Sequence, residues 1–222
     1  MSKPDGYYSN VNPLVVQLLE LPTGARVLDV GCAEGALGDF LKRDNPSISV
    51  AGVEMHGPAA DRAQKVLDEV WRGDFETWEP PEQYAASFDR VIFGDVLEHL
   101  VNPEAAVHKA RALLRPDGAI VTSVPNVRWL PIVRDLALRG EWTYRAEGIL
   151  DDTHLRFFTK SSIRALFERC SLSVEECVPS FSTQWGFAGK ILRLLARRFG
   201  TFEEFCTFQY VLRARLPAST GD

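Results

Sequence analysis

The sequence lacks a long apolar segment and has little cysteine, and both shortages limit what the protein can be. No uninterrupted apolar run approaches the roughly 20 residues that a helix needs to cross a membrane, and the opening MSKPDGYYSN has no apolar signal core. None of the four cysteines has the C-x-x-C or C-x-x-H spacing of zinc or redox motifs; they are Cys32, Cys170, Cys177 and Cys206. We therefore expect a cytoplasmic protein with free thiols.

Positive charge is also scarce. The chain has 25 Lys and Arg against 30 Asp and Glu, a formal net charge of −5, so we expect no nucleic-acid footprint spread over its surface. A local basic face remains open. With 222 residues, 45% of them hydrophobic, the chain is long enough for one globular domain with a full core, as a monomer or a homodimer.

Apolar strand-like runs alternate with helical patterns along the chain. The expected strands lie at 27–30, at 48–54, just before 73–74, at 88–96 and at 119–126. The expected helices follow Asn12-Pro13 and Gly35, cover 61–70 and begin at Asn102-Pro103. Such alternation with short loops predicts a parallel sheet covered on both faces, with ligands at the carboxyl ends of the strands.

The stretch VLDVGCAEGALGDFLK, residues 27–42, joins a buried strand to a helix through a glycine turn. Gly31 and Gly35 permit a close approach of a ligand to the backbone, and the free N–H groups of the helix start favour a polar or anionic group. The turn therefore predicts a small-ligand cradle. Nucleotide binders, dehydrogenases and methyltransferases all use such a turn.

Further segments narrow this choice. In order, VLDVGCAEG, GVE, GDFE, FDRVIFGDVLEHLVNPEAAV and ARALLRPDGAIVTSVPN resemble the class I S-adenosylmethionine-dependent methyltransferases, particularly the ubiquinone-type and the sugar or small-molecule branch. The resemblance covers roughly residues 7–214. It implies an α/β, doubly wound, mostly parallel seven-stranded sheet of the Rossmann-like methyltransferase fold. Segments 172–178 and 208–216 would form its antiparallel C-terminal hairpin edge.

The resemblance also implies a division of the chain and a cofactor site. We expect an N-terminal lid or helix at 1–25 and a methyltransferase domain at 26–222, with an acceptor-binding insertion at about 127–158. Glu54 would accept hydrogen bonds from the ribose hydroxyls, and Asp74 would read the adenine amino group. The expected residues around S-adenosyl-L-methionine are Tyr8, Asp29, Gly31, Cys32, Ala33, Gly35, Glu54, Met55, Asp74, Phe75 and Asp95.

Several of these residues have a plainer interpretation. Asp29 could only hydrogen-bond the turn backbone, Glu54 and Asp74 could be solvated acids, and Phe75 could be core. Ala33 stands where many family members have glycine, so we expect a slightly shifted loop that still binds.

Catalysis is assigned to the loop GILDDTHLRFFT, residues 148–159. A hydroxyl acceptor benefits from a base, and His154 is the preferred one because imidazole titrates near neutral pH. Asp151 or Asp152 would orient it or replace it, and His99 is structural or a second choice. Alternatively, Thr159 caps the next helix and His154 only bonds the backbone. A metal site of Asp151, Asp152 and His154 has no further ligand cluster to complete it, so we expect no metal.

The acceptor is expected to be a small molecule or sugar that is methylated on oxygen. Arg128, Arg134 and Arg145 could grip an anionic acceptor or could be solvated. The basic amphipathic stretch 189–200 is expected to pack on the protein rather than contact a membrane surface. Two other functions stay open. One is a cofactor-binding partner without catalysis; the other is a nicotinamide-dependent oxidoreductase, which Ala33 disfavours by breaking G-x-G-x-x-G.

Overall fold

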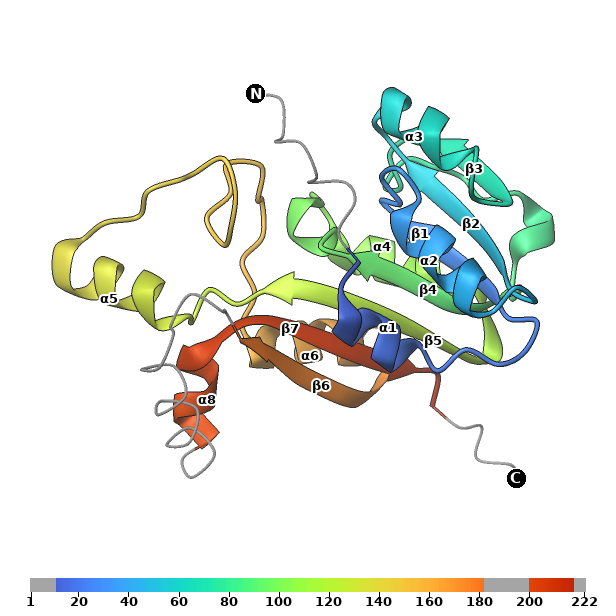
Figure 1. Cartoon of the computed structure of the whole chain (residues 1–222). Coiled ribbons are helices and arrows are strands. Elements are labelled where there is room, and N and C mark those ends of the chain that lie inside the picture. The colour runs from blue at the N-terminus through green and yellow to red at the C-terminus, as the bar shows by residue number, and fades with distance from the viewer. Residues whose placement is uncertain (1–10, 182–199, 218–222) are drawn as a thin grey trace.

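The computed structural model describes residues 11–181 and 200–217, and there it forms one sheet with helices on both faces (Figure 1). The strands are β1 (Arg26–Val30), β2 (Ser49–Glu54), β3 (Glu69–Arg72), β4 (Phe88–Gly94), β5 (Leu114–Pro125), β6 (Ser173–Phe181) and β7 (Thr207–Arg215). The α-helices are α1 (Pro13–Leu19), α2 (Ala36–Asp44), α3 (Gly57–Ala63), α4 (Pro103–Leu113), α5 (Leu130–Arg139), α6 (Lys160–Arg169) and α8 (Gly200–Cys206). Short 3-10 helices are η2 (Glu82–Tyr84) and η3 (Leu97–His99).

The sheet has seven strands in the order β3-β2-β1-β4-β5-β7-β6. The first five strands pair in parallel, and β7 lies antiparallel between β5 and β6. In the centre, Val30 of β1 is paired with both Val53 of β2 and Phe93 of β4, so the carboxyl ends of these strands lie at one edge. The expected mostly parallel, doubly wound sheet with an antiparallel C-terminal pair is confirmed.

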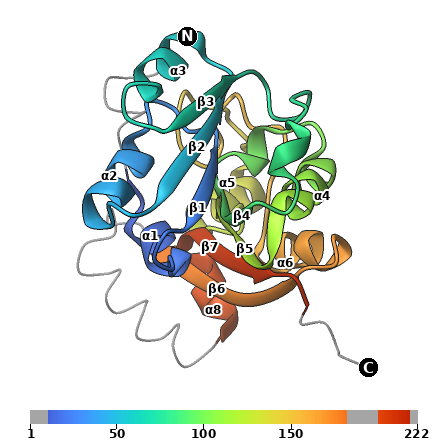
Figure 2. The same ribbon diagram turned by 90° about the vertical axis from the view of Figure 1, so that its right-hand side faces the viewer.

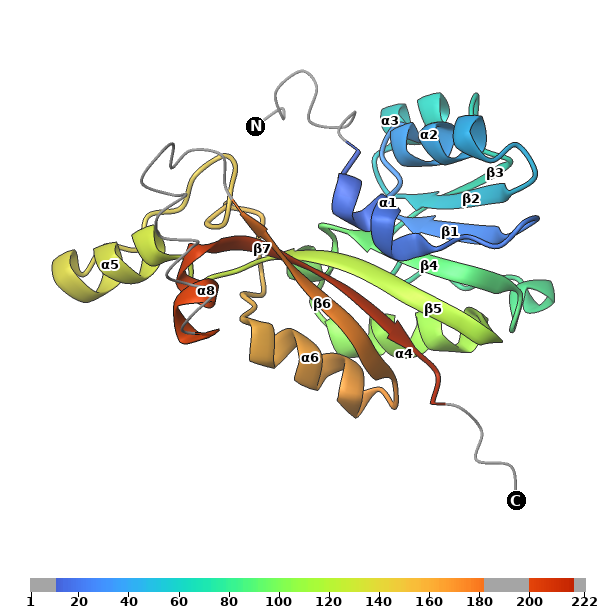
Figure 3. The same ribbon diagram turned by 60° about the horizontal axis from the view of Figure 1, so that its bottom comes forward.

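Helices cover both faces of the sheet (Figures 2 and 3). Each face has its own apolar core. Leu18 of α1, Leu41 of α2 and Ala63 of α3 pack on one face. Val107 of α4 and Ile163 of α6 belong to the cluster on the other face. Strands buried from both sides need continuous apolar sequence, which explains the runs in β1, β2 and β4.

Helix starts follow local capping chemistry. The Asn12 side chain accepts a hydrogen bond from Leu14 N before Pro13 opens α1, and Asn102 accepts from Ala105 N at the start of α4. Thr159 forms a reciprocal capping box with Ser162 at the start of α6. The predicted starts of these three helices are confirmed, because each depends only on neighbouring residues.

The helix expected over 61–70 is wrong. The helix α3 begins at Gly57, with Pro58 in its first turn, and ends at Ala63. The carboxylate of Asp68 accepts from Val50 N at 2.8 Å and pairs with Lys42 at 2.7 Å, so the following residues are drawn to the sheet and Glu69–Arg72 become β3. The tertiary contacts of one acid outweigh a helical pattern.

The strand expected at 119–126 begins earlier than predicted. The strand β5 begins at Leu114 and includes the RPDG segment, residues 115–118. The pairing of β5 with β4 shifts register between Phe88 and Arg90.

Gly52 in β2 offers a test of packing under the glycine turn. A Cβ there would lie 2.4 Å from Cys32 Sγ and 3.0 Å from Leu67 Cδ1, so we expect Gly52→Ala to destabilise the fold by about 1–3 kcal/mol. Gly94→Ala is the matched control, because a Cβ at Gly94 meets nothing within 4 Å. Thermal unfolding measures both variants, and adding Cys32→Ala should recover part of the loss. Equal stability of the two single variants would contradict this packing argument.

The segment after β5 leaves the body of the sheet. The helix α5 extends away from it and has no buried residue (Figure 1). The stretch 189–200 expected as an amphipathic helix lies outside the described residues, except that α8 begins at Gly200. Among the described helices, none is long and apolar enough to cross a membrane.

Candidate active site

A cavity of about 630 Å³ lies at the carboxyl ends of the parallel strands. That volume is within the usual range for small-molecule sites. The cavity is lined by most of the residues expected from the sequence: Asp29, Gly31, Cys32, Ala33, Glu54, Met55, Asp74, Phe75, Asp95, His99, Asp151 and His154. Gly35 and Asp152 do not line it, and Tyr8 lies outside the described residues.

The turn after β1 is built from left-handed backbone. Gly31, Ala33 and Gly35 have φ angles of 69°, 50° and 82°. A Cβ on Gly35 would lie 2.7 Å from Val66 Cγ2, so Gly35 acts by close packing of the turn rather than by lining the cavity. Ala33 adopts the same backbone region at a cost of about 1 kcal/mol.

Glu54 connects two loops at the end of β2. Its Oε2 accepts from Ala33 N at 2.8 Å and its Oε1 accepts from His56 N at 2.7 Å, while the side chain is 6% exposed. Each carboxylate oxygen has a second acceptor position, so these bonds leave room for ligand hydroxyls. The hydrogen bond to Ala33 also explains how the turn is held in its left-handed conformation.

Asp29 lies at the end of β1 and is 4% exposed. Burial, followed by the nearby Glu54 carboxylate, raises the pKa of Asp29 to about 7. Burial also raises the pKa of the Cys32 thiol far above its ordinary value, so Cys32 stays a neutral thiol in the turn. The interior of the turn thus holds an acid that can change charge near neutral pH.

The end of β3 supplies an acid and an aromatic ring. Asp74 Oδ1 accepts from Glu76 N at 2.9 Å, which shapes the loop. Phe75 is 3% exposed and packs edge-on against Phe93 with ring centroids 5.5 Å apart, so it belongs to the core and also lines the cavity. Met55 is 74% exposed at the cavity rim.

The sequence interpretation missed Gln209, which lines the cavity on this side. Gln209 at the start of β7 donates to Asp95 Oδ1 and accepts from Asn12 Nδ2 at 3.0 Å. These bonds connect β4, β7 and the start of α1. No local motif marks Gln209, because the antiparallel course of β7 alone brings its beginning to the carboxyl ends of the parallel strands.

The loop before α6 brings two of its three candidate residues to the cavity. His154 is 8% exposed, and its Nδ1 lies 3.0 Å from Ile149 O. Asp151 is 2% exposed and accepts from the N–H and hydroxyl of Thr153 at 2.9 and 2.6 Å. Asp152 is exposed and does not line the cavity. The backbone contact of His154 and the cap by Thr159 are therefore compatible with a position in the cavity.

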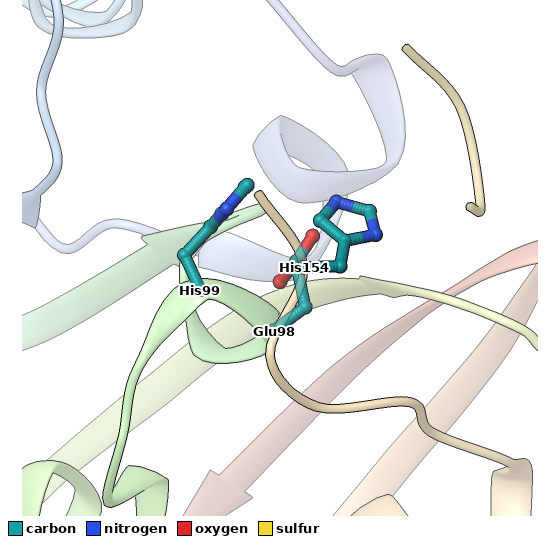
Figure 4. A group of neighbouring side chains, drawn as sticks. All are labelled: Glu98, His99 and His154. Atoms are coloured by element: carbon teal, nitrogen blue, oxygen red, sulfur yellow. The ribbon is translucent and has the colours of Figure 1, made fainter. Parts of the chain in front are cut away.

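The two histidines of the site meet although 55 positions separate them in the chain. The rings of His99 and His154 have centroids 4.7 Å apart and an interplanar angle of 71°. Beside them lies Glu98, which is 1% exposed and was not singled out from the sequence (Figure 4). Burial, and then the Asp95 and Asp151 carboxylates, raise the pKa of Glu98 well above its ordinary value. The segment DVLEHL, residues 95–100, could have indicated a buried Glu98, because it places an acid inside an apolar run.

The insertion contributes less than expected to the described cavity. Between 127 and 158, the cavity-lining residues are Gly148, Asp151 and His154. Arg128 pairs with Glu204 at 2.6 Å and Arg134 pairs with Asp135 at 2.7 Å. Neither these two arginines nor Arg145 line the cavity, so the described structure does not direct them at an acceptor.

Comparison with known proteins decides the family. Residues 7–176 match the family described as a methyltransferase domain. The chain belongs to the class I S-adenosylmethionine-dependent methyltransferases. The methyltransferase is 30% identical over 169 residues to the ubiquinone biosynthesis O-methyltransferase of Xanthomonas axonopodis pv. citri, covering 74% of this chain and 69% of that one.

Other relatives share smaller parts or only the fold. The corresponding enzyme of Alkalilimnicola ehrlichii is 30% identical over 125 residues, covering 53% of this chain and 50% of that one, so the methyltransferase matches about half of that relative's length. The structure of an S-adenosylmethionine-dependent methyltransferase from Aquifex aeolicus has a TM-score of 0.61 and 13% identity, covering 96% and 93% of the two chains. That likeness shows the fold.

The cofactor that the family implies suits the residues at the strand ends. Glu54 keeps acceptor positions beyond its two backbone bonds, and the Gly31 turn opens on the same cavity. The cavity also contains apolar Phe75 and acidic Asp74 after β3, which match an adenine ring and its amino group. None of the described lining residues is Lys or Arg, which suits the positive charges of the sulfonium and ammonium groups of this cofactor.

Proposed function

We propose that the methyltransferase transfers a methyl group to a hydroxyl oxygen of a small molecule or sugar. The observation that carries this proposal is the meeting of His99 and His154 at the wall of the cavity that also contains Glu54 and Asp29. A histidine there can accept the proton of a hydroxyl group at neutral pH. The names of the two relatives, both O-methyltransferases, support oxygen as the methylated atom.

In this reaction the cavity residues would have separate roles. S-adenosylmethionine, held by the Glu54 and Asp74 side of the cavity, supplies an electrophilic methyl group when bound. The Ile149 carbonyl accepts the Nδ1 proton of His154, so in the neutral ring Nε2 is the basic nitrogen. His154 Nε2 would take the proton of the acceptor hydroxyl, which would make the hydroxyl oxygen nucleophilic toward that methyl group. The buried loop around Asp151 keeps the ring in place.

Two measurements test this function. Calorimetry should detect S-adenosylhomocysteine binding and no comparable binding of NAD, which separates a methyltransferase from an oxidoreductase. Transfer of labelled methyl groups to a panel of phenols, catechols and sugars should show turnover for the wild type. We expect His154→Asn to retain the donor to Ile149 O and the cofactor affinity but to lose about 10²–10⁴-fold in kcat.

The control for this variant is His108→Asn, because His108 is exposed on α4 and does not line the cavity. Its turnover should equal that of the wild type. If His154→Asn turns over as fast as this control, His154 is not the base. If the wild type binds S-adenosylhomocysteine but methylates no hydroxyl compound, the chain is a cofactor-binding partner or methylates another atom.

A further inference from the structure

The loop that follows β3 is held by Lys109 of α4. The Nζ of this lysine donates to the backbone oxygens of Phe75, Glu76 and Trp78 at 2.8, 3.0 and 2.7 Å. An ammonium group has three N–H donors, so the three bonds to this loop account for all of them. One side chain of α4 therefore fixes the segment in which Phe75 follows Asp74.

The backbone of the same loop explains why a cation binds there. Asp74 O accepts from Thr77 N at 3.1 Å and from Trp78 N at 2.8 Å. The Asp74 carboxylate closes the turn further, because its Oδ1 accepts from Glu76 N at 2.9 Å. Carbonyl oxygens that lie close together repel one another, and the positive charge of Lys109 offsets that repulsion.

Lys109 also lies beside the aromatic ring that lines the cavity. Its Nζ is 5.2 Å from the centroid of the Phe75 ring, a distance at which a cation is attracted to a ring. The same ring packs against Trp78 and Phe93, with centroids 5.7 and 5.5 Å away. Since Phe75 and Asp74 both line the cavity, a change at Lys109 acts on two adjacent cavity residues.

A second contact ties the loop to α4 without Lys109. The Glu76 carboxylate accepts from Val101 N at 2.9 Å and from Asn102 N at 2.6 Å, just before α4 begins. Removal of the ammonium group therefore leaves the loop attached at one end. We expect such a variant to fold and to hold Asp74 and Phe75 less firmly.

We propose that Lys109 is a positioning residue that sets the base specificity of the cofactor site. By fixing the loop 74–78, it holds the Asp74 carboxylate and the Phe75 ring where the amino group and the ring of adenine bind. Lys109 does not line the cavity, so it acts through this loop rather than by contact with the cofactor. The proposal rests on the proposed function, because S-adenosylmethionine must bind beside Asp74.

The test compares two ligands that differ at one position of the base. S-inosylhomocysteine has an oxygen where S-adenosylhomocysteine has the adenine amino group, and calorimetry measures the affinity for each. We expect the wild type to prefer the adenosyl compound by about 10–100-fold, the size of one hydrogen bond to a carboxylate. In Lys109→Met, which keeps the apolar part of the side chain, the preference should fall to about 3-fold or less. An unchanged preference in this variant would overturn the proposal.

Lys42→Met is the matched control, because Lys42 makes similar contacts at the other end of β3. Its Nζ donates to Val66 O at 3.1 Å and to Asp68 Oδ1 at 2.7 Å, and neither of these residues lines the cavity. Both variants should have a lower Tm than the wild type, but Lys42→Met should keep the full preference for the adenosyl compound. The same loss of preference in both variants would mean general loosening of the protein and would contradict a specific role of Lys109.

Chemical restoration of the ammonium group completes the experiment. Lys109→Cys should lose the preference, and treatment with 2-bromoethylamine should restore it, because the modified cysteine carries an ammonium group at the same reach as lysine. Treated wild type controls for modification of the four native cysteines. A preference that stays low after complete modification at position 109 would also overturn the proposal.

The outcomes separate this proposal from the proposed function. A wild type that binds both compounds equally well contradicts only the base specificity assigned to Lys109. A wild type that binds neither compound contradicts the proposed function, and the role of Lys109 in it fails as well.

Discussion

Glu54→Ala is expected to lower the affinity for S-adenosylhomocysteine by about 10²–10³-fold. The substitution removes the carboxylate that accepts from Ala33 N and His56 N and that the family resemblance assigns to the ribose hydroxyls. Hydrogen bonds to a charged group contribute about 1.5–3 kcal/mol each, and 1.4 kcal/mol is a tenfold change in affinity. Loss of two such bonds to the ligand is thus sufficient for the expected effect.

Calorimetry on Glu54→Ala must distinguish lost contacts from a loosened protein. Glu76→Ala provides the matched control, because Glu76 also accepts from two backbone N–H groups and lines the same cavity. Both variants should lose about 1–3 kcal/mol of unfolding free energy, but Glu76→Ala should lose less than 10-fold in affinity. Similar affinities for the two variants would remove Glu54 from the ribose site.

Asp29→Asn is expected to stabilise the protein at pH 8 and to change its stability little at pH 4. The pKa of Asp29 is raised from 3.8 to about 7 by burial and by Glu54, so the native state holds this proton over a pH range in which the unfolded chain has lost it. Stability therefore falls as the pH rises from about 4 to 7. The variant, which has no proton to lose, escapes this fall.

The expected gain in stability of Asp29→Asn follows from the same shift in the pKa of Asp29. Each pH unit between the two pKa values changes the unfolding free energy by about 1.4 kcal/mol, so the variant should gain about 2–4 kcal/mol at pH 8, or about 5–10 °C in Tm. Asp95, whose pKa is raised by desolvation, also titrates in the cavity, so the effect must be taken from the difference between variant and wild type.

Asp117→Asn is the control, because Asp117 is exposed in β5 outside the cavity. Thermal unfolding of all three proteins at pH 4, 6 and 8 measures the effect. A gain for Asp29→Asn that is the same at every pH would mean that Asp29 does not carry the shifted proton. A buried acid that weakens the fold at neutral pH is expected where function needs it, so the variant should also bind S-adenosylhomocysteine less tightly.

The sequence by itself determined the parts of this protein that depend on neighbouring residues. The glycine turn at 31–35, the caps at Asn102 and Thr159, and the apolar runs of β1, β2 and β4 follow from local chemistry and were predicted with it. The acids at the strand ends could be placed near one another because parallel strands bring their carboxyl ends to one edge of a sheet.

Tertiary structure decided what depends on residues far apart in the chain. It brought His154 to His99 and Glu98, turned Asp152 to solvent, and carried Gln209 to Asp95 through the antiparallel course of β7. It also ended α3 at Ala63 and extended the strand expected just before 73–74 back to Glu69, into the predicted helix. Periodicity indicates which face of an element is apolar, but a contact between residues 55 or 114 positions apart leaves no pattern in the sequence around either residue. The arrangement of these side chains around the cavity therefore follows only from the tertiary structure.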